Sequence, residues 1–307
     1  IDKFIISSSI SAVLFALFSN IFLFIGKFIV AIISGSAGLM AESFHSLSDT
    51  LNQLLLFLGF KRSSIKDKLN FPFGKGKEQY FWSFIASILF IEFSGFVSIL
   101  EGYLKMQHPY IIKDVHFVYL IILLSFLLDG SALIYTIKIL RKKIRESNYK
   151  TIREYLKNIR DSIIINAFME DLGALIGIFI ILIGIILTQV LNNFIYDSIS
   201  SFGVGILLII IGIYLAKVSK DLLIGKGLTS NDRDRIIKIL KEIENINYII
   251  NIDGIYMGPN TVILGLDLNF KDGLSTEDIE KTIDNIEKRI RNELPFVKKI
   301  FVETEEI

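Results

Sequence analysis

The sequence predicts a membrane all-α protein with six transmembrane helices, followed by a small α+β domain. Its 307 residues are 52% hydrophobic, and the mean hydropathy of +0.55 is higher than that of soluble domains. Six hydrophobic segments are each long enough to cross a bilayer, which takes about 20 mostly apolar residues. These segments are residues 4–33, 37–60, 79–103, 116–140, 162–189 and 195–219. The composition changes to that of a soluble domain after Lys220, so we expect a transmembrane domain at 1–221 and a second domain at 222–307.

The basic residues predict how the spans are oriented. Residues 61–77, after the second span, and residues 138–160, between spans four and five, are rich in Lys and Arg, whereas the turns after spans one and five have none. Basic loops stay on the cytoplasmic side, so both termini are expected there, in a multi-pass protein of the plasma (inner) membrane. The net charge of +1 gives no reason to expect a nucleic-acid partner.

The segment after the sixth span predicts a small open sheet. Residues 230–244 have the apolar stripe of an amphipathic helix, and residues 261–270 alternate as a half-buried strand does. Turn residues separate that strand from an earlier one at about 248–257. Ser275, with Asp278 three residues later, predicts a helix N-cap, and a last strand is expected at about 297–303. The order αββαβ suggests two helices on one face of the sheet.

The second span contains the main candidate functional residues. Glu42, His45 and Asp49 lie there within a segment that is otherwise apolar. Ionisable side chains are costly at membrane depth and are functional by default there. His45 and Asp49 are four residues apart, so a helix places them on one face, as half of a tetrahedral site for a borderline cation such as Zn²⁺. The alternative is a structural His–Asp hydrogen bond, which the membrane setting disfavours.

Other polar residues of the spans are candidates for supporting roles. Glu42 is expected to line the same cavity as His45, and Asn52 is placed to orient the Asp49 carboxylate by a hydrogen bond. Asp129 in the fourth span belongs either to a permeation route or proton relay, or to a buried pair with Lys27 of the first span or with a helix end.

Together these features resemble the cation diffusion facilitator family of divalent-metal transporters. The resemblance rests on Gly35-Ser36 leading into AESFHSLSDTLNQ, on FPFGKGKEQYFWSF, on AFMEDLGALIG, and on the domain after Leu222. It implies a homodimer in the lipid bilayer that exchanges a metal ion for protons, and a cytoplasmic ferredoxin-like domain.

The resemblance also implies a ligand set. His45 and Asp49 match the family's pair in span two, and Asp171, followed by Gly177, matches the second member of its pair in span five. The first member falls on Ala167, which cannot bind metal, so we expect Glu170 to be the fourth ligand and Asn166 to be the reserve. The chain thus resembles a branch with His-x-x-x-Asp in span two and Glu-Asp in span five.

A further match is Lys77, which in the family takes part in a salt bridge at the dimer interface. The acidic partner is expected near Gly225 and Lys226, where this chain has no acidic residue, and Asp221 is a substitute.

The function that follows is export of a divalent cation, Zn²⁺ in exchange for H⁺, by alternating access. Mn²⁺, Fe²⁺ or Co²⁺ is the alternative ion, because the chain has no cysteine to favour a soft metal. A membrane-bound metal sensor or scaffold that does not transport is a second alternative. We do not expect an enzyme, since no His-Glu-x-x-His motif is present, and no cofactor is expected besides the transported cation.

Overall fold

The computed structural model describes residues 2–108, 112–146, 151–157 and 161–305, with side chains from residue 17 onward except those of 19, 146, 153 and 157. Part of the predicted basic loop, 147–150 and 158–160, therefore lies outside the described residues. The chain forms two compact units. The helical unit contains Ile1–Phe60 and Phe81–Ser219, and the mixed unit contains Lys61–Tyr80 and Lys220–Ile307. The domain boundary at 221/222 stays a prediction.

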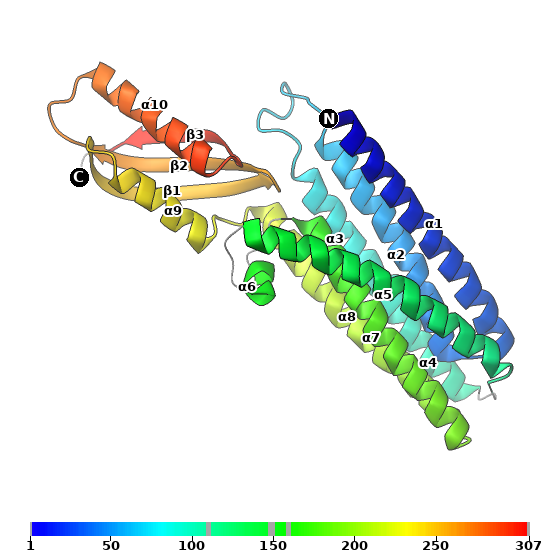
Figure 1. Ribbon diagram of the computed structural model, residues 1–307. Coiled ribbons are helices and arrows are strands. Elements are labelled where there is room, and N and C mark those ends of the chain that lie inside the picture. The colour runs from blue at the N-terminus through cyan, green and yellow to red at the C-terminus, as the bar shows by residue number, and fades with distance from the viewer. Residues whose placement is uncertain (1, 109–111, 147–150, 158–160, 306–307) are drawn as a thin grey trace. The chain divides into compact units, whose positions relative to one another are not determined.

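Long helices run side by side in the helical unit (Figure 1). The helices of this part of the chain are α1 (Asp2–Ser34), α2 (Ala37–Ser63), α3 (Glu78–Phe90), α4 (Val97–Gln107), α5 (Val115–Glu146), α7 (Ser162–Val190) and α8 (Ile195–Ile224). A short helix, α6 (Ile152–Lys157), lies between α5 and α7 in the sequence. A π-helical segment, Ile91–Phe96, joins α3 to α4, so these elements form one continuous helix.

Four helices among the described residues are long and apolar enough to cross a membrane: Glu78–Gln107, Val115–Arg145, Ser162–Val190 and Ile195–Ile224. Helices α1 and α2 occupy the first two predicted spans. The described apolar part of α1 is the shorter segment Asn20–Ser34. Helix α2 is long enough but is not among the four apolar helices, because polar residues line one of its faces. The helical unit therefore fits a membrane α-domain.

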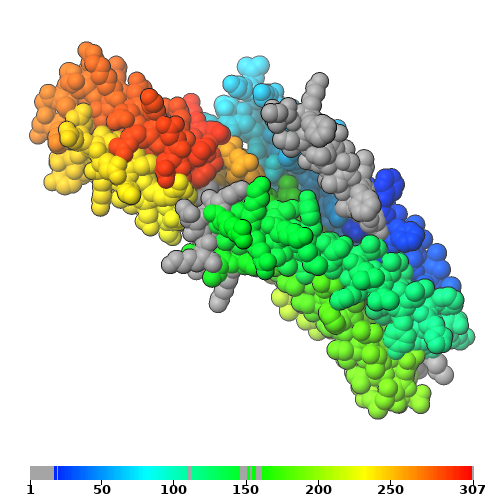
Figure 2. Space-filling model, viewed as in Figure 1, coloured from blue at the N-terminus to red at the C-terminus, as the bar shows by residue number. Residues whose placement is uncertain are grey.

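Helix α5 runs across the face of the helical unit shown in Figure 2. Its large exposed side chains are apolar along much of its length, and they include Phe117, Leu120, Leu123, Leu127 and Ile134. The apolar core lies on the other side of this helix, where buried side chains of α5 pack with those of α7 and α8. An apolar exterior over an apolar core is what a lipid environment requires, since lipid tails do not drive apolar groups inward.

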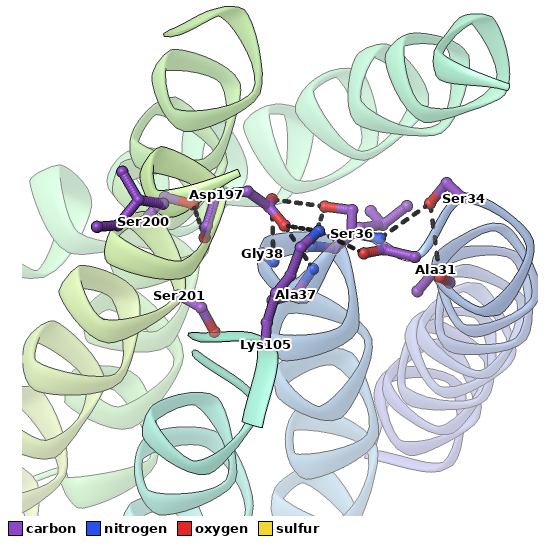
Figure 3. A network of polar contacts seen from close by, with 12 residues as sticks. Ala31, Ser34, Ser36, Ala37, Gly38, Lys105, Asp197, Ser200 and Ser201 are labelled. Atoms are coloured by element: carbon purple, nitrogen blue, oxygen red, sulfur yellow. Dashed lines mark hydrogen bonds and ion pairs between the residues drawn. The ribbon is translucent and has the colours of Figure 1, made fainter. Parts of the chain in front are cut away.

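A buried charge network fixes the start of α2 (Figure 3). The Asp197 carboxylate, from the first turn of α8, accepts hydrogen bonds from the backbone N–H groups of Ala37 (2.7 Å) and Gly38 (3.3 Å) and from Ser36 Oγ (2.8 Å). Lys105 Nζ of α4 lies 2.8 Å from the same carboxylate. Asp197 thus caps α2 from a distant part of the chain and joins α2, α4 and α8.

The mixed unit has the element order predicted from the sequence. After α8 it contains α9 (Ser230–Lys241), β1 (Ile246–Gly258), β2 (Thr261–Phe270), α10 (Thr276–Glu293) and β3 (Val297–Thr304). The sheet order is β1-β2-β3, with β1 antiparallel and β3 parallel to β2. Strand β2 buries one face, Val262, Leu264, Leu266 and Leu268. Helices α9 and α10 contact each other and the sheet, which makes this unit a small α+β domain.

The helix caps of this unit follow the sequence closely. Ser275 and Asp278 form the predicted N-cap as a full capping box, and Thr229 caps α9 in a similar way. Helix α9 ends at Lys241 rather than at residue 244, because the chain turns at Glu242. Ile243 is still buried, so the apolar stripe continues two residues past the helix.

Candidate metal centre

A polar stripe runs along one face of α2. Its members recur at intervals of three or four residues, which keeps them on one side of a helix. We call this set the α2 stripe: Glu42, His45, Ser46, Asp49, Asn52 and Gln53. Four of the six are buried and the other two are partly buried. The stripe therefore faces the interior of the helical unit, as the sequence predicts for His45 and Asp49.

His45 lies at the centre of the stripe. Its Nε2 atom is 3.6 Å from Asp49 Oδ2, so the predicted i, i+4 pair is present. On the other side of the ring, Nδ1 lies 3.4 Å from the hydroxyl of Ser94, and the ring meets Phe90 edge to face. Ser94 belongs to the π-helical segment between α3 and α4, and such segments are frequent at functional sites. A hydrogen bond at Nδ1 leaves Nε2 as the nitrogen that faces Asp49.

The acidic residues of α7 are held by neighbouring side chains. Glu170 accepts a hydrogen bond from the Asn52 amide of the stripe, which brings α2 and α7 together here. Asp171 accepts one from Thr136 Oγ1 of α5 at 2.7 Å. The predicted reserve residue, Asn166, is fully buried and donates to the Ser162 carbonyl oxygen at 2.7 Å.

Several buried polar atoms along this surface have no hydrogen-bond partner among the described residues. They are Glu42 Oε2, His45 Nε2, Asp49 Oδ1, Asn52 Oδ1 and Gln53 Oε1 on α2, and Asn166 Oδ1 on α7. A buried polar group without a partner lowers the free energy of unfolding by about 1–3 kcal/mol. Six such groups on two adjoining helices would therefore destabilise the helical unit if nothing bound to them. Five of the six are oxygen atoms with lone pairs, and the imidazole nitrogen accepts in one of its two tautomers, so a cation or water molecules can satisfy these groups.

The predicted ligands do not all converge in this structure. Within the part of the chain that is described, no group of three or more His, Cys, Asp or Glu side chains is close enough to hold a metal ion. His45 and Asp49 are adjacent, while Asn52 holds Glu170 and Thr136 holds Asp171. The four-ligand site therefore stays a prediction.

The remaining predicted residues have clear positions. Glu42 and Asp129 both face the ammonium of Lys27, at 3.1 and 3.7 Å, and the roles expected of them stay predictions. In the mixed unit, Lys77 Nζ donates to the carbonyl oxygen of Leu223 at 3.2 Å. Asp221, the substitute partner proposed for Lys77, pairs instead with Lys220 at 3.3 Å.

Sequence reasoning missed four residues of this surface, of which Ser46 follows Glu42 by four residues on the α2 stripe. Gln53 lies four residues after Asp49, and the same helical spacing that identified Asp49 from His45 would have found it. Thr136 and Ser94 are common polar residues in apolar spans. Only the packing of α5 and of the π-helical segment against the site gives them a role.

The fold and the site together define a multi-pass integral membrane protein with a polar, cation-compatible surface inside its helical unit. Residues 13–224 match the cation efflux transmembrane domain, so the chain belongs to the cation efflux, or cation diffusion facilitator, family of transporters. The family resemblance predicted from the sequence is thereby confirmed.

Curated relatives support the same assignment. The chain is 28% identical over 270 residues to the mitochondrial proton-coupled zinc antiporter SLC30A9 of Xenopus laevis, covering 86% of this chain and 48% of the relative. It is 26% identical over 269 residues to the human SLC30A9, covering 85% and 47%. Metal tolerance protein C4 of Arabidopsis thaliana is 27% identical over 259 residues, covering 84% and 56%. The chain thus spans about half the length of these relatives.

Proposed function

We propose that this chain transports a divalent metal cation through the helical unit, as a Zn²⁺/H⁺ antiporter that exports metal from the cytoplasm. The observation that carries the proposal is the set of unpartnered acceptor atoms on α2 and α7, which lie in the domain that matches a cation efflux family. Removing a divalent ion from water is costly, and carboxylates with an imidazole offset that cost where hydrocarbon cannot.

The proposed ligands are His45 and Asp49 of α2 and Glu170 and Asp171 of α7. In the arrangement described, Asn52 and Thr136 hold the two α7 carboxylates. An entering ion would replace these hydrogen bonds, and the amide oxygens of Asn52 and Asn166 would support the ligands. This assignment also defines the branch, with His-x-x-x-Asp on α2 and Glu-Asp on α7.

Proton coupling follows from the ligand chemistry. Carboxylate and imidazole groups bind metal only when deprotonated, so metal affinity falls as the pH falls. Protons that enter from the acidic side would displace the ion on that side. The site would then reopen to the cytoplasm with its ligands protonated. Each charge that moves across 100 mV is worth about 2.3 kcal/mol, so proton entry can drive export. Alternating access around a site near the bilayer midplane is the usual geometry of such transporters.

Zinc is the proposed cargo because the relatives with the longest matches include antiporters named for zinc. The residues also favour a second candidate. Three carboxylates with one imidazole and no sulfur form a harder site than most zinc sites, which suits Mn²⁺, Fe²⁺ or Co²⁺.

The architecture proposed around this site has six spans, with α1 and α2 as the first two, and both termini on the cytoplasmic side of a plasma (inner) membrane. The αββαβ domain is proposed to be ferredoxin-like, and the functional form to be a homodimer. The parallel pairing of β3 with β2 and the paired helices α9 and α10 support the first point. The basic loops support the orientation.

Transport by sealed vesicles that contain the purified chain tests the function. An imposed pH gradient should drive uptake of Zn²⁺ and, in a panel of ions, rank Zn²⁺ above Mn²⁺, Fe²⁺ and Co²⁺. Uptake of Mn²⁺ in preference to Zn²⁺ would select the second candidate. Metal binding without gradient-driven uptake would reject transport and leave a sensor or scaffold.

A further inference from the structure

Lys27 is a fully buried cation in the middle of the helical unit. Its side chain on α1 is 1% exposed. The ammonium donates to Ser46 Oγ at 2.9 Å and to Glu42 Oε1 at 3.1 Å, both on the α2 stripe. It also lies 3.7 Å from Asp129 Oδ2 of α5. A lysine ammonium has three donors, and three oxygen atoms lie within 3.7 Å of this one.

Lys27 faces more acidic groups than its one ammonium can neutralise when both are ionised. One ammonium stands between two carboxylates, from α2 and α5. Glu42 is only 2% exposed, and its second oxygen, Oε2, has no hydrogen-bond partner among the described residues. Asp129 makes the longest of the three contacts, and 15% of its side chain is exposed. With both carboxylates ionised, these three side chains would carry one surplus negative charge.

Without the ammonium, the same atoms would form a site for a divalent cation. Two carboxylates and a hydroxyl are the hard oxygen ligands that such ions take. The two negative charges would match one divalent ion, and Glu42 Oε2 would supply a ligand atom that is now unused. Helix α7 closes the site on this side, because a Cβ at Gly177 would lie 3.3 Å from Glu42 Oε2.

We propose that Lys27 is a built-in cation that fills a second cation site in the helical unit. The site consists of Glu42, Ser46 and Asp129, next to His45 and Asp49 along α2. By filling it, Lys27 keeps these carboxylates from binding an additional ion and so limits the number of ions held per chain. The proposal rests on the proposed function only in taking His45 and Asp49 as ligands of the neighbouring metal site.

The number of bound ions tests the proposal directly. The full-length chain in detergent is dialysed against Zn²⁺, and the metal bound per chain is measured by elemental analysis. Lys27→Met should bind one more Zn²⁺ per chain than the unmodified protein. The triple variant Lys27→Met/Glu42→Gln/Asp129→Asn should lose this extra ion.

A matched control is Lys105→Met, which removes another fully buried lysine. Its partner Asp197 is a single carboxylate already bonded to the start of α2, so no extra ion is expected. Unchanged stoichiometry in Lys27→Met, or an extra ion that persists in the triple variant, would overturn the proposal. If the unmodified protein binds no ion, the proposed function fails, while a gain of one ion in Lys27→Met still supports this inference.

Thermal stability covers the case in which Lys27→Met folds poorly. Zn²⁺ should then raise its unfolding temperature more than it raises that of the triple variant, because only the former keeps both carboxylates. Equal responses of the two variants to Zn²⁺ would also overturn the proposal.

Discussion

Asp197→Asn should destabilise the helical unit strongly, although the side chain keeps its size. The carboxylate and Lys105 are both fully buried and 2.8 Å apart. Removing one partner of a buried ion pair costs about 3–5 kcal/mol, because it deprives the remaining charge of its counter-charge. Loss of the α2 cap adds about 1 kcal/mol, since an amide in place of a carboxylate weakens the bonds from Ala37 and Gly38. The expected total is about 4–6 kcal/mol, a large part of a typical folding free energy of about 5–15 kcal/mol.

Asp161→Asn is the matched control for this substitution. Asp161 also caps a helix, α7, and also pairs with a lysine, Lys143 at 2.9 Å. That pair is partly exposed, so its loss together with the weakened cap should cost about 1 kcal/mol. Equilibrium unfolding of the full chain in mixed micelles measures both variants. A difference between them of less than about 1 kcal/mol would refute the argument that burial makes the Asp197 pair critical.

Three further predictions concern the metal site and the mixed unit. His45→Asp should shift competition from Zn²⁺ toward Mn²⁺, because it removes the imidazole of the proposed site; an unchanged ion ranking would mean that His45 does not touch the metal. Residues 222–307 contain no His or Cys, so a chelator should leave the proposed dimer intact in size-exclusion chromatography, and dissociation would contradict this. Hydrogen bonds from the side chain and backbone of Ser275 hold the pKa of Asp278 below its usual value. Their stabilisation is present above the unfolded pKa of about 4 and is lost as the pH falls through the lower folded value. Asp278→Asn should therefore flatten the loss of helix content in this acid range, as followed by circular dichroism.

The parts of the structure that depend on local sequence could be predicted. Alternation of apolar residues in 261–270 identified β2, and the Ser275 and Asp278 pair identified the start of α10. The spacing of His45 and Asp49 placed both on one face of α2. In each case the pattern lies within one element, whose geometry fixes which side chains are neighbours.

The contacts between helices could not be predicted in the same way. Asp197 caps a helix that begins 160 residues earlier, and no periodicity links the two positions. The hydrogen bond of Thr136 to Asp171 and that of Asn52 to Glu170 likewise depend on how α2, α5 and α7 pack. From the sequence, a pair with Lys27 is one of the alternative roles of Asp129. Only the structure shows that Lys27 also donates hydrogen bonds to Glu42 and Ser46.

Metal-driven proton flux in vesicles tests the central claim most directly. Asp49→Ala and Asp171→Ala should each abolish the flux that Zn²⁺ evokes, because each removes a proposed ligand from one of the two helices. Asp161→Asn, which removes a carboxylate from the start of α7 instead, should retain it. Both alanine variants must still elute as folded protein at the position of the unmodified chain. Full Zn²⁺-dependent flux in either alanine variant would contradict transport through a site shared by α2 and α7.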